Sequence, residues 1–260
     1  MTYCLAIKVD EGLVFASDSR TNAGIDHVST YSKMHTFNWP GNRYFVLLSA
    51  GNLATTQAVV KKIKADAEDV DALSLRNVMD IDAAAAYVGK VSTDIQRVHA
   101  EIDPANTNYE VTFIFGGQIA NGQPAIFLIY PQGNYIHEPT EHPFLQIGET
   151  KYGKPILDRV IRHNIPMELA GRCALVSINS TIRSNVSVGP PIEILFYPKG
   201  NLNEGYRLSL TESSHFYQAV NDAWNEGLRN ALNTLPPFEW EQGHKIAQFV
   251  QETTPTETMR

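Results

Sequence analysis

The sequence predicts an α+β fold in which two antiparallel β-sheets pack face to face between two layers of helices, a four-layer αββα sandwich. Two observations lead to this prediction. Short apolar segments joined by tight turns indicate antiparallel hairpins, and pairs of helical segments with apolar stripes separate one group of strands from the next. The apolar stripes of such helices need sheet faces to cover. With 260 residues, 43% of them hydrophobic, the chain can form the core that this arrangement needs.

Two hairpins open the chain. The turn Asp10-Glu11-Gly12 separates two apolar, partly alternating segments, and Pro40-Gly41-Asn42 separates two more. A polar connection over residues 22–30 lies between the hairpins. The predicted strands are residues 2–9 with 13–17, and 33–39 with 44–49.

The rest of the chain alternates helical pairs with further strands. Helical periodicity favours residues 54–68 and 81–100, then 154–163 and 166–180, and a closing helix over 214–235. Strand patterns cover residues 110–115, where Gly116-Gly117 predicts the end of the strand, and 125–130, 135–138, 144–147, 192–197 and 206–210. We found no linker, repeat or low-complexity tract, so we expect one domain over residues 1–250 and a polar tail over 251–260.

Charge and cysteine content restrict the function. Twenty-one basic and 28 acidic residues give a net charge of −7, which opposes binding to nucleic acid. Cys4 and Cys173 offer at most one disulfide, which suits a reducing compartment. The N-terminal residues lack the order of a secretory signal, and no apolar run has the length of a membrane span. We therefore expect a cytoplasmic protein that binds neither nucleic acid nor membrane.

Thr2 is the most informative candidate for chemistry. Removal of Met1 would leave a threonine with both a hydroxyl nucleophile and a free α-amine. The reference pKa of an α-amine, about 7.7–8.0, suits proton transfer from the hydroxyl near neutral pH. Many proteins begin with Met-Thr, however, so Thr2 alone indicates little.

Three further motifs in the predicted strands and their ends make a functional interpretation of Thr2 more specific. They are Asp18-Ser19-Arg20, Ser32-Lys33-Met34 and Ser49-Ala50-Gly51. With Thr2, this pattern resembles the β-subunits of the proteasome, a group of N-terminal-nucleophile hydrolases with the αββα fold. The opening Met-Thr-Tyr-Cys, the segment from Gly148 to Pro155 (Gly-Glu-Thr-Lys-Tyr-Gly-Lys-Pro) and the long C-terminal part most resemble the bacterial branch of that group called Anbu, the ancestral β-subunit.

The resemblance implies a role for each matching residue. Thr2 would be the nucleophile and its amine the base, Lys33 would polarise both groups, and Asp18 would orient Lys33. Gly51, at the start of a predicted helix, would offer its N–H to an oxyanion. The resemblance also gives assisting roles to Arg20 and Ser187 and places Thr21, Ser32 and Ser49 beside the substrate pocket. Taken singly, Asp18 and Lys33 could be a surface ion pair, and Gly51 could merely end a strand.

The chain departs from the proteasome pattern at positions expected near the threonine amine. Ser187 can stand for one assisting serine, but Ser184 occupies the place of an aspartate, and Glu149 falls near the place of a second serine. The hydrogen bonding of the amine is therefore open at this point.

Other motifs add no cofactor. Pro139 within the segment His137 to His142 prevents the helix that a His-Glu-x-x-His zinc site needs, so we expect no metal and no cofactor. His35 shares a strand face with Lys33 and is either a neighbour of the site or an ordinary half-buried histidine.

We thus expect a threonine peptidase or amide hydrolase that acts on peptides or unfolded proteins within a ring-like homo-oligomer. Two alternatives remain: a non-catalytic ring scaffold like the proteasome α-subunits, and an N-terminal-nucleophile amidohydrolase acting on a small molecule. The sequence does not indicate whether an unfoldase acts with it.

Overall fold

The computed structural model describes residues 1–22, 28–102, 107–238 and 241. These residues belong to two compact units, one over residues 1–221 and the other over residues 222–260. The predicted tail, 251–260, and the predicted domain boundary at residue 250 lie outside the described residues, so both stay predictions. In the described part of the chain, no helix is long and apolar enough to cross a membrane.

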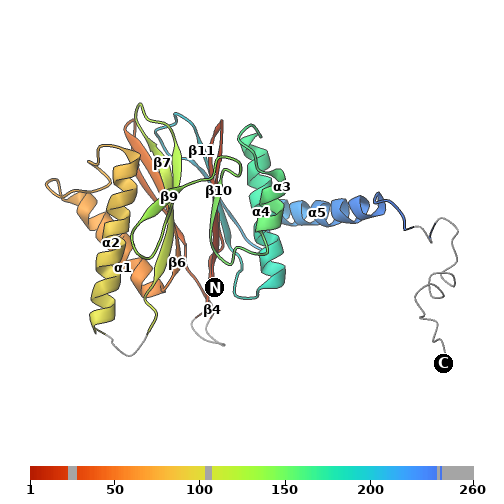
Figure 1. Cartoon of the computed structure of the whole chain (residues 1–260), viewed down its shortest axis with the longest axis horizontal. Helices are drawn as coiled ribbons and strands as arrows, with labels where there is room; N and C mark the ends of the chain where they lie inside the picture. The colour runs from red at the N-terminus through yellow and green to blue at the C-terminus, as the bar shows by residue number, and fades with distance from the viewer. Residues whose placement is uncertain (23–27, 103–106, 239–240, 242–260) are drawn as a thin grey trace, which may run out of the picture. The chain divides into compact units, whose positions relative to one another are not determined.

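Two five-stranded antiparallel sheets form the centre of the first unit (Figure 1). The first sheet has the order β10–β1–β2–β11–β12, and the second has the order β5–β6–β7–β8–β9. Strands of the first sheet are β1 (Tyr3–Val9), β2 (Gly12–Ser17), β10 (Phe144–Gly148), β11 (Ile192–Pro198) and β12 (Tyr206–Leu210). Strands of the second are β5 (Met34–Trp39), β6 (Arg43–Gly51), β7 (Val111–Ile119), β8 (Ala125–Ile129) and β9 (Tyr135–His137).

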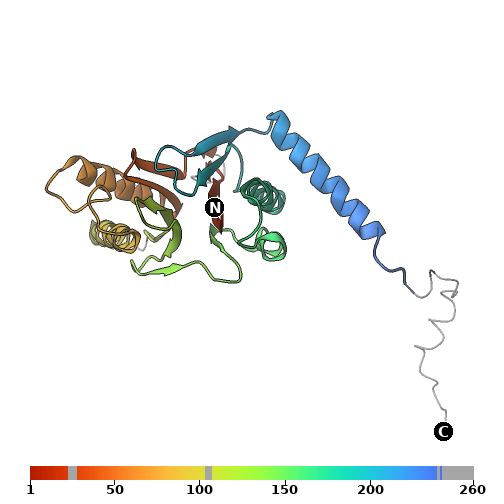
Figure 2. The same cartoon turned by 90° about the horizontal axis from the view of Figure 1, so that it is seen from above.

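Two pairs of helices cover the outer faces of these sheets. The helices α1 (Leu53–Glu68) and α2 (Ile81–Ile102) pack on the second sheet, and α3 (Lys154–Val160) and α4 (Met167–Ser184) pack on the first. Figure 2 shows the same four layers from above. The chain therefore has the predicted αββα sandwich. The last helix, α5 (His215–Asn233), crosses the boundary between the two units.

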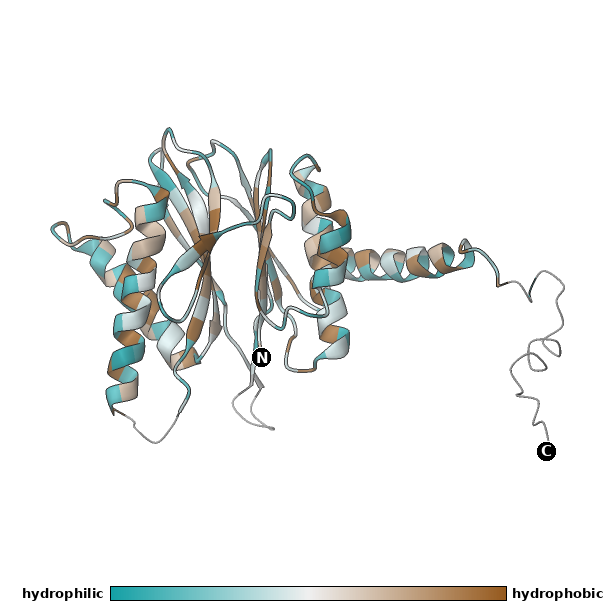
Figure 3. Cartoon of the chain, in the orientation of Figure 1, coloured by the Kyte–Doolittle hydropathy of each residue, from teal (hydrophilic) through white to brown (hydrophobic). Residues whose placement is uncertain are grey.

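Alternation along the central strands explains why the layers pack in this order. In β1, Tyr3, Leu5 and Ile7 lie in the core against α3 and α4, whereas Cys4 and Ala6 lie in the core between the sheets. β6 follows the same rule. Phe45 and Leu47 pack against α1 and α2, and the residues of β6 on either side of each of them lie between the sheets. A strand that is apolar on both faces is buried on both. In Figure 3 hydrophobic residues accordingly occur on both sheets.

Apart from shifts of a few residues at element ends, such as α3 ending at Val160 and α4 extending to Ser184, the structure differs from the sequence prediction in two places. The segment predicted as a polar connection contains a small two-stranded sheet, β3 (Arg20–Asn22) and β4 (Val28–Thr30), and residues 23–27 between them lie outside the described part. Gly116 and Gly117 do not end a strand, because β7 continues to Ile119. Gly117 has φ +148°, and a side chain there would come within 2.8 Å of the Phe45 Cα, so glycine lets β6 and β7 pair closely.

Candidate active site

Thr2 lies immediately before β1, where β1 meets the end of β10. The carbonyl oxygen of Thr2 accepts a hydrogen bond of 2.7 Å from the Glu149 N–H, and Tyr3 pairs with Gly148 in the sheet. Gly148 has φ +83°, and a Cβ there would overlap the carbonyl oxygen of Thr2. The close approach of Gly148 therefore fixes the backbone of Thr2.

Lys33 and Asp18 form an ion pair at the same end of the sheets. Lys33 Nζ lies 2.6 Å from Asp18 Oδ1, and the side chains are 7% and 0% exposed. The ammonium group also donates to the carbonyl oxygen of Arg20 at 2.7 Å. In a buried pair each charge is compensated by its partner and not by water, so loss of one partner leaves the other charge uncompensated. The surface interpretation of Asp18 and Lys33 is wrong.

Asp18 also connects the ion pair to the backbone at the start of β1 and in the loop after α4. Its Oδ1 accepts from the N–H of Tyr3 at 3.0 Å, and its Oδ2 accepts from the N–H of Gly189 at 3.1 Å. Burial raises the pKa of Asp18, while the Lys33 ammonium and the two N–H donors oppose that change. The carboxylate thus fixes the ammonium group relative to the start of β1.

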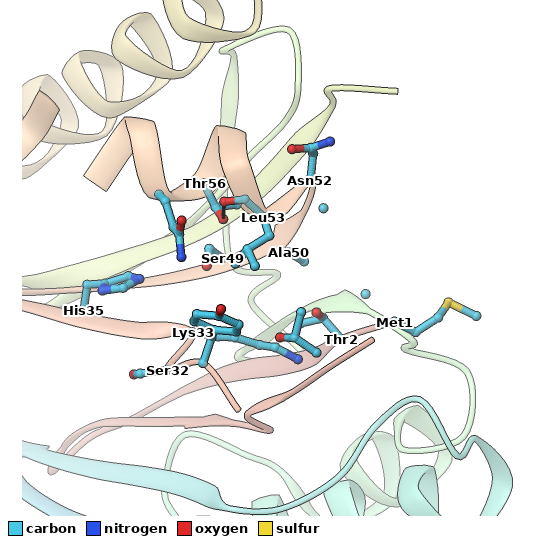
Figure 4. A pocket seen from close by; sticks show the side chains of 15 residues that line it. Met1, Thr2, Ser32, Lys33, His35, Ser49, Ala50, Asn52, Leu53 and Thr56 are labelled. Carbon is cyan, nitrogen blue, oxygen red and sulfur yellow. Dashed lines mark hydrogen bonds between the residues drawn. The ribbon is translucent and has the colours of Figure 1, made fainter. Parts of the chain in front are cut away.

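An open cavity of about 660 Å³ lies over these residues. Thr2, Lys33 and Gly51 line it, as do the predicted pocket residues Thr21, Ser32 and Ser49. Figure 4 shows Thr2 and Lys33 side by side among the lining residues, with the ammonium group of Lys33 directed toward Thr2. Asp18 does not line the cavity, because it is fully buried behind Lys33. The remaining lining residues are Met1, Tyr31, His35, Ala50, Asn52, Leu53, Thr56, Gln57 and Gly148.

Gly51 ends β6 directly before the first residues of α1. It has φ +121°, and a side chain there would come within 2.9 Å of the Val111 Cα. The next residue, Asn52, caps α1 by accepting from the Thr55 N–H at 3.2 Å. The backbone thus changes direction at the rim of the cavity, beside the positive end of the helix dipole.

Arg20 accepts from Lys33 through its carbonyl oxygen, but the side chains of Arg20 and Ser187 lie away from the cavity. Arg20 donates to the carbonyl oxygen of Val186 at 2.8 Å, and the Ser187 N–H donates to the side chain of Asn185 at 3.0 Å. Neither residue lines the cavity, although both help to shape the loop over residues 185–189. Sequence spacing could not give this result, because it depends on how that loop turns after α4.

Several lining residues were not among the predicted ones. Thr56 and Gln57 lie one turn into α1 from Leu53, so helical spacing from Gly51 could have found them. His35 also lines the cavity, which makes it a neighbour of the site. Burial lowers the pKa of its imidazole to about 4, and Lys64 adds to the shift. His35 is therefore neutral near pH 7.

The N-terminal amine of Met1 lies within the same charged surroundings. Burial lowers its pKa, and the positive charge of Lys33 lowers it further, whereas Asp18 and Glu149 act in the opposite direction. The residue Met1 itself is 65% exposed. Among the described residues, no group of three or more His, Cys, Asp or Glu side chains could hold a metal ion.

A four-layer αββα sandwich with Thr2 at the start of β1 and a buried lysine–aspartate pair beside it defines a protein with the fold of a proteasome subunit. The family described as Proteasome subunit matches residues 2–196. The chain belongs to the proteasome-subunit family and, within it, to the Anbu group. No match was found among curated proteins.

Solved Anbu structures are similar over nearly their whole length. Anbu (ancestral beta-subunit) from Yersinia bercovieri is 41% identical, with a TM-score of 0.86, over 92% of this chain and 99% of that one. The structure described as the helical assembly of the Anbu complex from Pseudomonas aeruginosa is 46% identical, with a TM-score of 0.85, over 91% and 98%. Anbu from Hyphomicrobium sp. strain MC1 is 41% identical, with a TM-score of 0.82, over 92% and 100%.

Proposed function

We propose that this protein is a threonine-type hydrolase that cleaves peptide or amide bonds with Thr2 as its N-terminal nucleophile. The observation that carries the proposal is the buried ion pair between Lys33 and Asp18, 2.6 Å apart, whose lysine lines an open cavity together with Thr2. A buried charge pair is costly to keep, so its place next to a hydroxyl favours a chemical role.

The reaction begins after Met1 is removed. The free α-amine of Thr2 takes the proton of Oγ1, and Oγ1 attacks the substrate carbonyl carbon. The N–H of Gly51 donates to the oxygen that becomes negative. The ammonium group then returns its proton to the leaving amine as the C–N bond breaks, which leaves an ester on Thr2. Water activated by the same amine hydrolyses the ester and restores the hydroxyl.

Lys33 supports this sequence electrostatically. Its positive charge favours the deprotonated hydroxyl and disfavours a protonated amine, so both groups are ready to react near neutral pH. Lys33 itself need not transfer a proton, since its hydrogen bonds go to Asp18 and to the carbonyl oxygen of Arg20.

A peptide epoxyketone tests the proposal, because it closes a ring only with a hydroxyl and an amine on the same residue. We expect protein from which Met1 has been removed to form one adduct, on Thr2. Peptide hydrolysis should fall in proportion to the fraction of protein that carries the adduct. Mass spectrometry of the N-terminal peptide locates the adduct. Thr2→Ala and protein that retains Met1 are the matched controls, and neither should react.

The same experiment separates the alternatives. Folded protein without Met1 that forms no adduct and cleaves no peptide or small amide would favour the non-catalytic scaffold. An adduct together with turnover of small amides only would favour a small-molecule amidohydrolase. Unchanged turnover by Thr2→Ala would remove Thr2 from the mechanism.

We further propose that copies of this chain assemble with one another in the cytoplasm. The structure from Pseudomonas aeruginosa is described as a helical assembly, and this chain exposes apolar side chains, among them Met79, Ile102 and Leu232. Both cysteines are free, as a reducing compartment allows. We expect light scattering to give a mass several times that of one chain and negative-stain images to show rings or ring-like assemblies. A monomer at micromolar concentration would contradict the assembly.

A further inference from the structure

Glu149 is a second buried acidic residue beside Thr2. Its side chain is 8% exposed, and its backbone N–H holds the carbonyl oxygen of Thr2 at 2.7 Å. Because Glu149 directly follows β10, the pairing of β10 with β1 fixes it next to the first residues of the chain. A carboxylate this buried needs nearby donors or positive charge.

The partners of the Glu149 carboxylate give it only part of that compensation. Oε2 accepts from the side-chain amide of Asn185 at 2.9 Å, and Oε1 lies 3.4 Å from Lys151 Nζ. The Lys151 side chain is 67% exposed, so water weakens its attraction. This contrasts with Asp18, whose cation is buried with it.

One loop connects the two carboxylates. Asn185, at its start, donates to Glu149, and Gly189, at its end, donates its N–H to Asp18. The loop is held in turn by the hydrogen bond from Arg20 to the Val186 carbonyl oxygen. The Asp18 carboxylate accepts from the N–H of the residue after Thr2, and the backbone N–H of Glu149 donates to the carbonyl oxygen of Thr2. The loop and these two contacts therefore hold both carboxyl groups near the start of β1.

Lys33, Asp18 and Glu149 are the charged groups that act on the amine of Met1, one residue before the nitrogen that becomes the amine of mature Thr2, and Lys151 lies beside Glu149. Asp18 is neutralised by Lys33 at 2.6 Å. Glu149, in contrast, is paired with Lys151, which is exposed to solvent. The negative charge of Glu149 is therefore more available than that of Asp18 to an ammonium group formed at the N-terminus.

We propose that Glu149 is a positioning residue that holds the α-amine of mature Thr2 and stabilises the ammonium group formed when that amine takes the proton of Oγ1. Glu149 neither gains nor loses a proton in this step. The inference rests on the proposed function for its catalytic consequence, but the charge interaction with the amine can be measured without activity.

The test is the pH dependence of acetylation of the Thr2 α-amine by acetic anhydride in assembled protein without Met1, read by mass spectrometry of the N-terminal peptide. We expect Glu149→Gln to lower the apparent pKa of the amine by about one unit. The matched control is Glu138→Gln, since Glu138 is also a buried carboxylate, 9% exposed and paired with Lys8. The proposal is overturned if Glu149→Gln and Glu138→Gln titrate alike.

Activity provides a second readout. Because a weaker base removes a proton less readily, Glu149→Gln should move the acid limb of epoxyketone labelling to lower pH and also lower its plateau by about tenfold. If Glu149 were only structural, Glu149→Gln would lower the rate of epoxyketone labelling without moving the acid limb of its pH profile. That result would also overturn the proposal. Glu149→Gln could lower the apparent pKa of the amine in a protein that never reacts with the epoxyketone. That result would support Glu149 as the partner of the amine and would contradict only the proposed function.

If Glu149→Gln does not fold, a second variant, Lys151→Gln, tests the same interaction. Lys151→Gln removes the exposed cation from Glu149, so the carboxylate should attract the amine more strongly and raise its apparent pKa. Lys154→Gln, which removes an exposed lysine paired with Asp158 instead, is its control. Equal titration of these two variants would contradict the proposal.

Discussion

Asp18→Asn is expected to destabilise the protein by about 3–5 kcal/mol and to abolish epoxyketone labelling of Thr2. The asparagine keeps a side-chain oxygen for the Tyr3 or Gly189 N–H, but it leaves the Lys33 ammonium without a negative partner in a buried place. An uncompensated buried cation accounts for most of the loss. Urea unfolding measures the stability, and mass spectrometry measures the labelling.

A double-mutant cycle separates the charge from the packing. Lys33→Met in the Asp18→Asn background removes the unpaired cation, so the double variant should be less destabilised than the sum of the two single variants. Asp158→Asn is the matched control, because Asp158 pairs with Lys154 at a similar 2.7 Å but on the surface, and its loss should cost only about 0–1 kcal/mol. Additive losses at Asp18 and Lys33 would contradict the assigned ion pair.

The architecture could be predicted from the sequence because local patterns carry it. The apolar segments on either side of Asp10-Glu11-Gly12 predicted a hairpin, and β1 and β2 pair antiparallel there. Turn residues such as Pro40 mark where strands reverse. The pattern failed at Gly117, because a glycine that ends a strand and a glycine that lets two strands approach look the same in sequence.

The candidate site could be predicted only in part. The resemblance to proteasome β-subunits placed Thr2, Lys33 and Gly51 together; in the structure all three line one cavity, Thr2 and Lys33 directly before β1 and β5 and Gly51 at the end of β6. The resemblance already put Glu149 near the amine, but its contact with Thr2 needed the pairing of β1 with β10, which joins residues far apart in the chain, and its contact with Asn185 needed the path of a loop. Contacts of this kind depend on the assembled fold, and neither periodicity nor turn chemistry encodes them.

Gly148→Ala is expected to lower the rate of epoxyketone labelling by about a hundredfold. An alanine Cβ at residue 148 would overlap the carbonyl oxygen of Thr2 and come within 2.7 Å of its carbonyl carbon. Since Gly148 lies in the sheet register with Tyr3, β10 cannot move away without losing pairs with β1. The start of the chain must therefore shift, and a small displacement of Thr2 from Lys33 is enough to slow the reaction.

Backbone strain at Gly148 has to be separated from this displacement, and Gly41 offers the control. Gly41 has φ +74°, close to the +83° of Gly148, but no atom lies within 4 Å of a Cβ built there. Gly41→Ala should therefore lose about 1–3 kcal/mol of stability from its backbone conformation and still label at the wild-type rate. Gly148→Ala should lose more stability, because the overlap adds to the strain. Equal labelling by the two variants would mean that the contact between residues 148 and 2 does not position the nucleophile.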